Sequence, residues 1–499
     1  MNSYIHTPRT ISIKDIEKRD YNLSASQYKG LIMPNENYKP LKDFLFRDLN
    51  RKDLGVEVGS LSYIDKSPYA FIRTKALQEY SYLPIITNET ALPIMPGEFV
   101  QMNLKEGDLL ISKDSNIGEI VILDKDYPNH MPSGAIYKLP IQDKWRYYIL
   151  AIVKHEIFRE QLDCMVPKGA TIRHAKTMFL DCKIPLPNKN SKNTIEFVSL
   201  LTRAIINKEK LIVQRHNNII QLIDDELRQN QKPNTFTYHL PKYNDIVSIK
   251  RLDASLYKEE FKKKIFNILN YNGGCKPLTE LDLDLKPGPS LEVKLLGTRI
   301  DSQIKYDGFY RLITPKQVTN FGTIKNEEYI GTPTKIAPIQ YGDIIFGESG
   351  TGRTMVFLDN DNNTINNAHA HILRTKLSND MDRVITIRSI LQYYKEIGIT
   401  DCMTVGGSGG HLSPSYFDRL MIPNFPKNIQ KKVSSLYYSR LDYNTKGFNL
   451  SNFLEKDCSY NCTAGIYELD RSAKHLRRLL DIAIDDIIND RDVKISFDI

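Results

Sequence analysis

The sequence lacks the usual features of secreted and membrane proteins. No apolar signal-peptide core follows Met1 in the segment MNSYIHTPRTISIKD. The longest apolar stretches, such as Tyr147 to Val153, are far shorter than the ~20 residues that a membrane span needs. Six cysteines are present without any CxxC pair, which fits reduced thiols. We therefore expect a cytoplasmic protein with no membrane partner.

Candidate metal ligands are also scarce. Cys458 and Cys462 lie close together and His475 follows 13 residues later, but no fourth zinc ligand is apparent. His369 and His371 would share one face of a strand, again without a third ligand. The sequence therefore predicts no metal site.

Complete catalytic motifs are missing as well. The segment Gly347 to Thr354 approaches a phosphate-binding P-loop, but Arg353 stands where that motif has lysine, and the residues that follow favour a strand where the motif opens a helix. Gly406 to Gly410 matches G-x-S-x-G only formally, because Pro414 follows almost at once. No adenine-methylation motif and no glycine-rich S-adenosylmethionine loop occurs. We expect no catalytic residues.

The composition is that of a globular protein. The chain has 499 residues, of which 41% are hydrophobic and 26% charged. This length suggests roughly three domains. The net charge of +8 is a weak indication of a polyanionic partner such as nucleic acid.

A long helix is predicted near the middle of the chain, from Ser191 to Asn230. No glycine or proline occurs there until Pro233, and apolar residues recur at heptad spacing. Lys208 and Arg215 occupy the same track as Leu201 and Leu222. Such a rod, roughly 54 Å long, needs a second helix to cover its apolar seam. The seam residues are Val198, Ile205, Ile212 and Ile219.

The two halves of the sequence resemble each other. Gly342 lies 235 residues after Gly107, Cys402 lies 238 after Cys164, and similar segments keep one order. This order predicts an internal duplication. The matching pairs are Arg19–Tyr28 with Arg251–Tyr257, Lys39–Leu41 with Lys276–Leu278, Tyr69–Leu77 with Tyr310–Val318, Gly107–Ile111 with Gly342–Phe346, Asp163–Met165 with Asp401–Met403, and Lys183–Pro187 with Met421–Phe425.

Each copy is predicted to be an α+β domain followed by a helical arm. Alternating apolar runs indicate hairpins near residues 107–123 and 342–358, and helices at Trp145 to Gln161 and Val384 to Glu396. The predicted domains are residues 1–190 and 233–427. The predicted spacer helices are residues 191–232 and 428–499, and the second is interrupted by an inserted loop at 442–463 that is rich in Asn, Ser and Tyr. The seam residues of the second spacer helix are Leu476, Leu480, Ala483 and Ile487.

This arrangement resembles the specificity subunit of type I restriction–modification systems. The resemblance depends on the duplicated order of an Arg-Leu-Asp-Ala-Ser-x-x-Tyr-like segment, a Gly-Asp strand and an apolar-Pro segment before a long helix. It implies two tandem target recognition domains, each reading one half of a split DNA site, with pseudo-twofold symmetry. It also implies that the two helices pair as an antiparallel, coiled-coil-like spacer and dock methyltransferase subunits.

The resemblance further implies what this chain binds. We expect double-stranded DNA, two methyltransferase subunits and restriction/translocase subunits as partners, with S-adenosylmethionine, ATP and Mg bound by those subunits and no cofactor by this chain. Candidate DNA contacts are polar residues at loop tips. They are Arg73, Lys75, Lys113, Ser115, Asn116, Lys168, Thr171, Arg173 and His174 in the first copy, and Arg311, Lys316, Ser349, Thr351, Arg353, Ser408 and His411 in the second.

Two other hypotheses remain open from the sequence. One is a P-loop-like protein that hydrolyses nucleotides with Gly347 to Thr354. The other is a structural coiled-coil adaptor that carries β domains.

Overall fold

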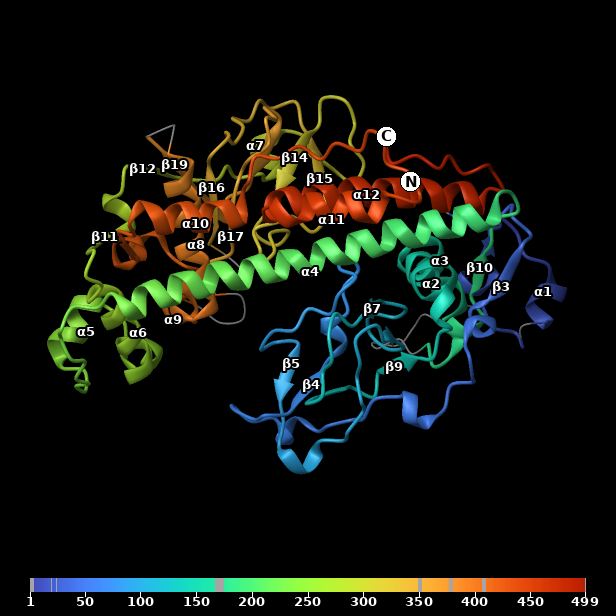
Figure 1. The fold of residues 1–499 in the computed structure, drawn as a ribbon, viewed down its shortest axis with the longest axis horizontal. Coiled ribbons are helices and arrows are strands. Elements are labelled where there is room, and N and C mark those ends of the chain that lie inside the picture. Colours follow the sequence, from blue (N-terminus) through green and yellow to red (C-terminus); the bar gives the residue numbers. More distant parts are fainter. Residues whose placement is uncertain are drawn as a thin grey trace. The chain divides into compact units, whose positions relative to one another are not determined.

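The chain folds into two compact units that mix helices and strands (Figure 1). The computed structural model describes residues 4–18, 20–23, 25–166, 175–348, 352–376, 380–405 and 410–498. Unit 1 comprises Met1–Leu211, Asp442–Cys462 and Leu469–Ile499. Unit 2 comprises Ile212–Leu441 and Thr463–Glu468.

The centre of unit 1 is a three-stranded sheet of order β7-β6-β9. Strand β6 (Leu109–Ser112) is antiparallel to both β7 (Ile120–Ile122) and β9 (Ile136–Leu139). All residues of β6 and β7 are buried, and all of them except Ser112 are apolar, as expected for strands inside a core. The connection between them contains Gly118, whose φ of 81° favours glycine. The hairpin predicted at 107–123 is thereby confirmed.

The other strands of unit 1 form a second sheet and two isolated pairs. In the sheet of order β5-β4-β8, β4 (Ala70–Ile72) is antiparallel to β5 (Ala91–Pro93) and parallel to β8 (His130–Pro132). The antiparallel pairs are β1 (Ile5–His6) with β2 (Gly30–Leu31) and β3 (Tyr38–Pro40) with β10 (Lys183–Pro185).

The prediction of one helix from Trp145 to Gln161 was wrong in its continuity. The structure has α2 (Arg146–Lys154) and α3 (Glu156–Met165), separated by an extended His155. The ring Nδ1 of His155 accepts a hydrogen bond from the backbone N–H of Ile157 at 3.3 Å and so caps α3. Periodicity missed this break because the apolar spacing continues through it. Unit 1 also contains the short helix α1 (Ile13–Glu17).

Unit 2 is built around a four-stranded sheet of order β12-β19-β16-β17. Strand β16 (Ile344–Gly347) is antiparallel to β17 (Thr354–Val356) and to β19 (Ala370–Thr375), and β19 also pairs with β12 (Leu283–Pro287). The hairpin predicted at 342–358 is therefore confirmed. Helix α8 (Met381–Glu396) lies against β17, and twelve of its residues are buried.

A second sheet of unit 2 has the order β13-β15-β14-β18. Strand β14 (Tyr310–Ile313) is antiparallel to β15 (Glu328–Gly331) and parallel to β18 (Thr364–Asn366). The remaining elements are β13 (Ile300–Ser302), the pair β11 (Cys275–Pro277) with β20 (Met421–Pro423), and the helices α5 (Tyr243–Ile249), α6 (Glu259–Leu269), α7 (Val293–Leu296), α9 (Ile399–Met403) and α10 (Lys427–Tyr437).

The predicted central helix is α4 (Ser191–Gln229), a continuous helix of 39 residues. Its residues up to Leu211 belong to unit 1 and the others to unit 2. Within unit 1 it runs antiparallel to α12 (Ile466–Ile488), because Glu209 pairs with Arg477 and Asn188, just before α4, bonds Asp490. The seam residues Val198, Ile205, Ile212, Ile219, Leu476, Leu480, Ala483 and Ile487 are all buried.

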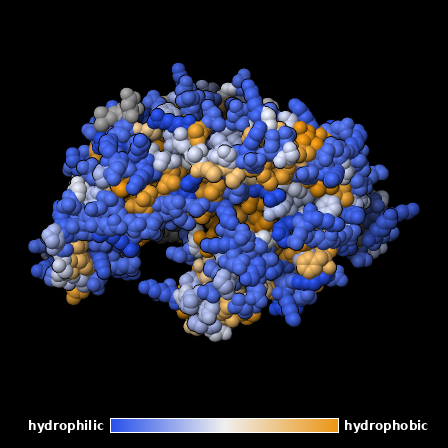
Figure 2. Space-filling view, in the orientation of Figure 1, coloured by the Kyte–Doolittle hydropathy of each residue, from blue (hydrophilic) through white to orange (hydrophobic). Residues whose placement is uncertain are grey.

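One hydrophobic core connects the sheet of unit 1 to these helices. It contains Leu109 and Ile111 from β6, Ile149 from α2, Val198 from α4 and Leu480 from α12. Figure 2 shows a face that is largely hydrophilic, with hydrophobic patches across its middle. Among the helices that the structure describes, none has the length and apolar character needed to cross a bilayer.

The inserted segment 442–463 is not wholly a loop. Its second half is helix α11 (Phe453–Thr463), and Phe453, Asp457 and Asn461 on one face of this helix are buried. The prediction of a loop followed the Asn- and Ser-rich composition. It was wrong for α11 because these polar side chains find partners on α4, where Lys208 bonds both Asp457 and Asn461.

Candidate nucleic-acid interface

In unit 1 the predicted DNA-contacting residues gather around the turn between β6 and β7. The backbone N–H of Lys113 donates to the carbonyl of Ala135 at 2.8 Å, and the carbonyl of Lys113 accepts from the N–H of Ala175 at 2.9 Å. The side-chain amide of Asn116 donates to the carbonyl of Leu77 at 3.2 Å. These bonds bring the turn, the start of β9 and the segment around Leu77 together.

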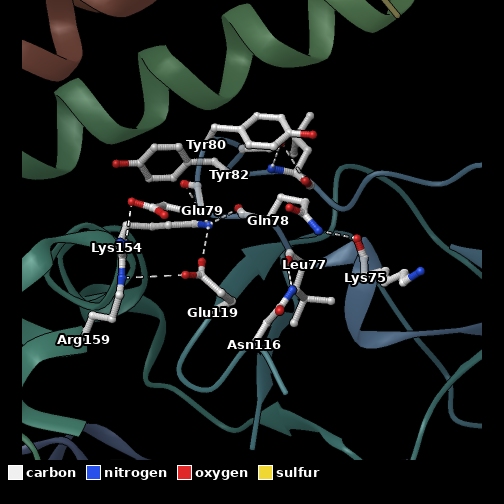
Figure 3. Close-up of polar contacts among 12 residues, drawn as sticks. Lys75, Leu77, Gln78, Glu79, Tyr80, Tyr82, Asn116, Glu119, Lys154 and Arg159 are labelled. Carbon is white, nitrogen blue, oxygen red and sulfur yellow. Dashed lines mark hydrogen bonds and ion pairs between the residues drawn. The ribbon is translucent and has the colours of Figure 1, made fainter. Parts of the chain in front are cut away.

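The polar side chains of this cluster differ in their exposure to solvent and in whether their charges are paired. Lys75 is exposed, and Figure 3 shows its side chain directed away from the other labelled residues. Ser115 is also exposed, in a left-handed conformation with φ of 61°. Lys113 forms an ion pair with Asp114 at 2.5 Å, and Arg73 is half-buried. The positive charge of Lys113 is therefore partly compensated within the chain.

The segment from Gln78 to Leu83 is fixed to the surrounding helices. The buried Nζ of Lys154 donates to the carbonyl of Gln78 at 2.7 Å, and Arg159 pairs with Glu79 at 2.5 Å (Figure 3). From α4, the carboxylate of Glu209 accepts from the backbone N–H of Tyr82 at 2.9 Å. Burial lowers the pKa of Lys154 to about 8, against the opposing effect of Glu119 and Glu209. This segment positions Leu77 and, through it, Asn116.

In unit 2 the described candidates Arg353 and His411 lie near the end of β16, where the N–H of Gly347 bonds the carbonyl of Arg353. The N–H of Glu348 donates to the carbonyl of His369 at 2.9 Å, and the carbonyl of Glu348 accepts from the N–H of Leu412 at 3.1 Å. His411 and His369 are both exposed, with ring centroids 6.5 Å apart. A guanidinium nitrogen of Arg353 donates to the carbonyl of Val318 at 3.4 Å. His411 and Arg353 are thus on neighbouring segments.

Arg311 has a different environment from the other candidates. Its guanidinium pairs with Asp359 at 2.6 Å and with Glu327 at 3.2 Å, and only 15% of its side chain is exposed. The pKa of Arg311 is raised because these carboxylates outweigh the effect of burial. The two acidic partners compensate its charge, so Arg311 adds little to the positive potential of the surface.

Lys325 is a residue that sequence reasoning missed. It lies in the hairpin that carries the exposed Lys316, where Val318 pairs with Ile324 and the N–H of Lys325 donates to the carbonyl of Gln317 at 2.9 Å. Burial, together with the nearby charges of Arg353 and Lys316, lowers the pKa of Lys325 to about 8. No motif marks Lys325, because only the hairpin register places it beside these cations.

Several predicted contacts lie outside the residues that the structure describes. They are Lys168, Thr171, Arg173, His174, Ser349, Thr351 and Ser408. The described residues Ala175, Glu348 and His411, which are close to them in the sequence, belong to the two clusters above.

The P-loop hypothesis is not supported by the geometry. After Gly352 and Arg353 the chain continues as strand β17, which pairs with β16, and no helix begins there. A P-loop requires the N-terminus of a helix to face the phosphates. Within the described parts of the chain, no group of three His, Cys, Asp or Glu residues is arranged to hold a metal ion.

Comparison with known proteins gives matches at the level of structure alone. Neither a protein-family model nor a curated protein sequence matches the chain. The match to the type I restriction–modification S subunit from M. genitalium covers 91% of this chain and 95% of that subunit's chain, with 12% identity and a TM-score of 0.39. A chain from a study of complex assembly and conformational transition of the type I R-M system covers 91% and 98%, with 12% identity and a TM-score of 0.27. The HsdS subunit from Thermoanaerobacter tengcongensis covers 91% and 96%, with 11% identity and a TM-score of 0.26.

Proposed function

We propose that this chain is the DNA sequence-recognition subunit of a type I restriction–modification complex and carries out no chemistry itself. In this proposal each unit reads one half of a bipartite DNA site. The helices set the spacing between the half-sites and dock methyltransferase subunits. S-adenosylmethionine, ATP and Mg would then be bound by the partner subunits.

The observation that carries the proposal is that both units pair their strands in the same way. In unit 1, β4 is antiparallel to β5 and parallel to β8, while in unit 2, β14 is antiparallel to β15 and parallel to β18. The central strands β6 and β16 each pair with the next strand and with a later one. This correspondence supports an internal duplication, and a duplicated reader fits a two-part DNA site.

Contacts made by single residues also occur in the same form in both units. Lys39 pairs with Ile184 in unit 1, and Lys276 pairs with Ile422 in unit 2, so the Lys-Pro-Leu segment of each copy contacts its own apolar-Pro segment. The hydroxyl of Tyr257 donates to the carbonyl of Arg251, six residues earlier, as the hydroxyl of Tyr28 does to that of Asn22. These contacts support placing the sequence landmarks at equivalent points of two related domains.

The loop clusters have the chemistry that duplex recognition needs. Lys75 and Lys316 are exposed cations suited to phosphates, and Ser115 and His411 are exposed groups suited to hydrogen bonds with base edges. The two units differ strongly between landmarks. We therefore propose two different half-sites.

The test is to express the chain with its methyltransferase partner in a host and to sequence the methylated genome. The expected result is adenine methylation at one split motif with a fixed gap. Omitting this chain should abolish the motif. Methylation without sequence preference, or methylation that persists without this chain, would contradict the proposal.

A further inference from the structure

Three cations meet at one point of unit 2. The hairpin from Lys316 to Lys325 is closed by the pairing of Val318 with Ile324 and by the bond from the N–H of Lys325 to the carbonyl of Gln317 at 2.9 Å. The guanidinium of Arg353 reaches this hairpin at the carbonyl of Val318, 3.4 Å away. Lys316 is adjacent to Gln317, and the charges of both Lys316 and Arg353 act on Lys325.

The buried Arg388 holds this arrangement in place. Its Nε donates to the carbonyl of Thr354, next to Arg353, at 3.0 Å, and its Nη2 donates to the carbonyl of Asn320 in the hairpin at 3.3 Å. Its guanidinium also lies over the ring of Tyr437, 4.7 Å from the centroid. The three cations therefore belong to segments that are held together by hydrogen bonds to Arg388.

Unit 1 has the same local geometry without the same charges. The N–H of Ile85 donates to the carbonyl of Ala76 at 2.9 Å, as that of Lys325 does to Gln317. The amide of Asn116 donates to the carbonyl of Leu77 at 3.2 Å, as Arg353 does to Val318. Isoleucine and asparagine thus replace two of the cations of unit 2. Only the lysine before each segment, Lys75 or Lys316, is common to both.

The gathering of charge in unit 2 is unfavourable in the free protein. Lys325 is half-buried, and its pKa of about 8 reflects burial together with repulsion from Arg353 and Lys316. The Nε of Arg353 is buried and has no hydrogen-bond partner among the described residues. A bound anion would offset this repulsion, because its charge is opposite to that of all three side chains.

We propose that Lys316, Lys325 and Arg353 bind one backbone phosphate of duplex DNA, a contact that unit 1 does not reproduce at Lys75, Ile85 and Asn116. This inference rests on the proposed function, since it assumes that unit 2 lies on DNA. A phosphate contact fixes the position of the protein without reading bases. Unit 2 therefore contributes more of the salt-dependent affinity than unit 1.

The experiment measures equilibrium binding of the full-length chain, assembled with its methyltransferase partner, to a duplex that carries the methylated motif and to one with altered half-site bases. Lys325→Gln is compared with wild type over a range of salt concentrations. Binding should weaken roughly 3- to 10-fold on both duplexes, and the slope of log Kobs against log salt should become shallower by about 0.9. The ratio of the two affinities should stay unchanged.

Two further variants control the result. Lys335→Gln removes an exposed lysine of the same unit and should leave the slope unchanged. Lys325→Arg retains the charge and should keep the wild-type slope, while melting curves verify that each variant is folded. An unchanged slope for Lys325→Gln would overturn the phosphate site, and so would an affinity loss confined to one duplex. Absence of DNA binding by the wild-type complex would instead overturn the proposed function.

Discussion

At the scale of single residues, Lys208 shows how a polar side chain is accommodated in an apolar helix seam. It is fully buried, and its Nζ lies 2.7 Å from a carboxylate oxygen of Asp457 and 2.7 Å from the side-chain oxygen of Asn461. The rings of Tyr443 and Tyr460 also lie within 5.0 Å of the ammonium group. The inserted segment thus supplies both the counter-charge and the aromatic surroundings of Lys208.

This environment predicts a strong and non-additive effect of mutation. Asp457→Ala should destabilise unit 1 by about 3–5 kcal/mol, because it leaves the buried ammonium without its counter-charge. The double variant Lys208→Met, Asp457→Leu should recover most of that loss, since no charge then remains buried. Urea denaturation of the wild type, Asp457→Ala, the single variants Lys208→Met and Asp457→Leu, and the double variant measures the coupling. Equal losses in Asp457→Ala and the double variant would show that the ion pair is not the cause.

At the scale of elements, His155 determines where α2 ends and α3 begins. Its Nδ1 caps α3 only while that nitrogen is unprotonated, and its Nε2 lies 3.6 Å from Asp485. Burial lowers the pKa of His155 and outweighs the opposing effect of Asp485, and Arg159 lowers it further. The neutral imidazole is therefore the form that the folded unit holds.

The lowered pKa makes stability depend on pH in a definite direction. As the pH falls below about 6.5, the unfolded chain binds a proton at His155 before the folded chain does, so stability decreases by up to about 1.4 kcal/mol per pH unit. His155→Asn retains a capping side chain without the titration. We expect the melting temperature of wild type to fall more between pH 7 and pH 5 than that of the variant. Parallel curves for the two proteins would argue against this role.

At the scale of the whole molecule, the proposed duplication provides matched positions whose effects on DNA binding should be unequal. Lys75 and Lys316 are both exposed and follow equivalent strands, but only Lys316 belongs to a cluster with Lys325 and Arg353. Charge reversal at Lys316 also repels the phosphate from that cluster.

We therefore predict that Lys316→Glu weakens DNA binding more than Lys75→Glu does. The difference should shrink at high salt, because mobile ions screen both changes. Equilibrium binding at two salt concentrations measures it, and the exposed Lys335→Glu serves as a control for net charge. An equal loss of affinity for the two variants would mean that the two units contribute equally to the electrostatic part of DNA binding.

Local patterns in the sequence were sufficient to predict several elements. Heptad spacing without glycine or proline predicted α4, and apolar runs around polar turns predicted the hairpins β6–β7 and β16–β17. These signals are local, because helix and strand periodicities depend on near neighbours along the chain. The same patterns predicted one helix across His155 and a loop at α11, where a cap and a buried partner decided otherwise.

The set of side chains that lie together at the candidate site, and the pairing of their charges, depended on contacts between segments distant in the sequence. The partners of Lys208 are about 250 residues away, and the cation cluster needs both the register of the 316–325 hairpin and a bond from Arg353 to it. Arg311 was a candidate from its strand position, and only folding placed Asp359 beside it. The sequence by itself determined the repeated order of segments and the long helix. The tertiary structure decided which charges are paired and which gather, because pairing depends on distances that local periodicity does not encode.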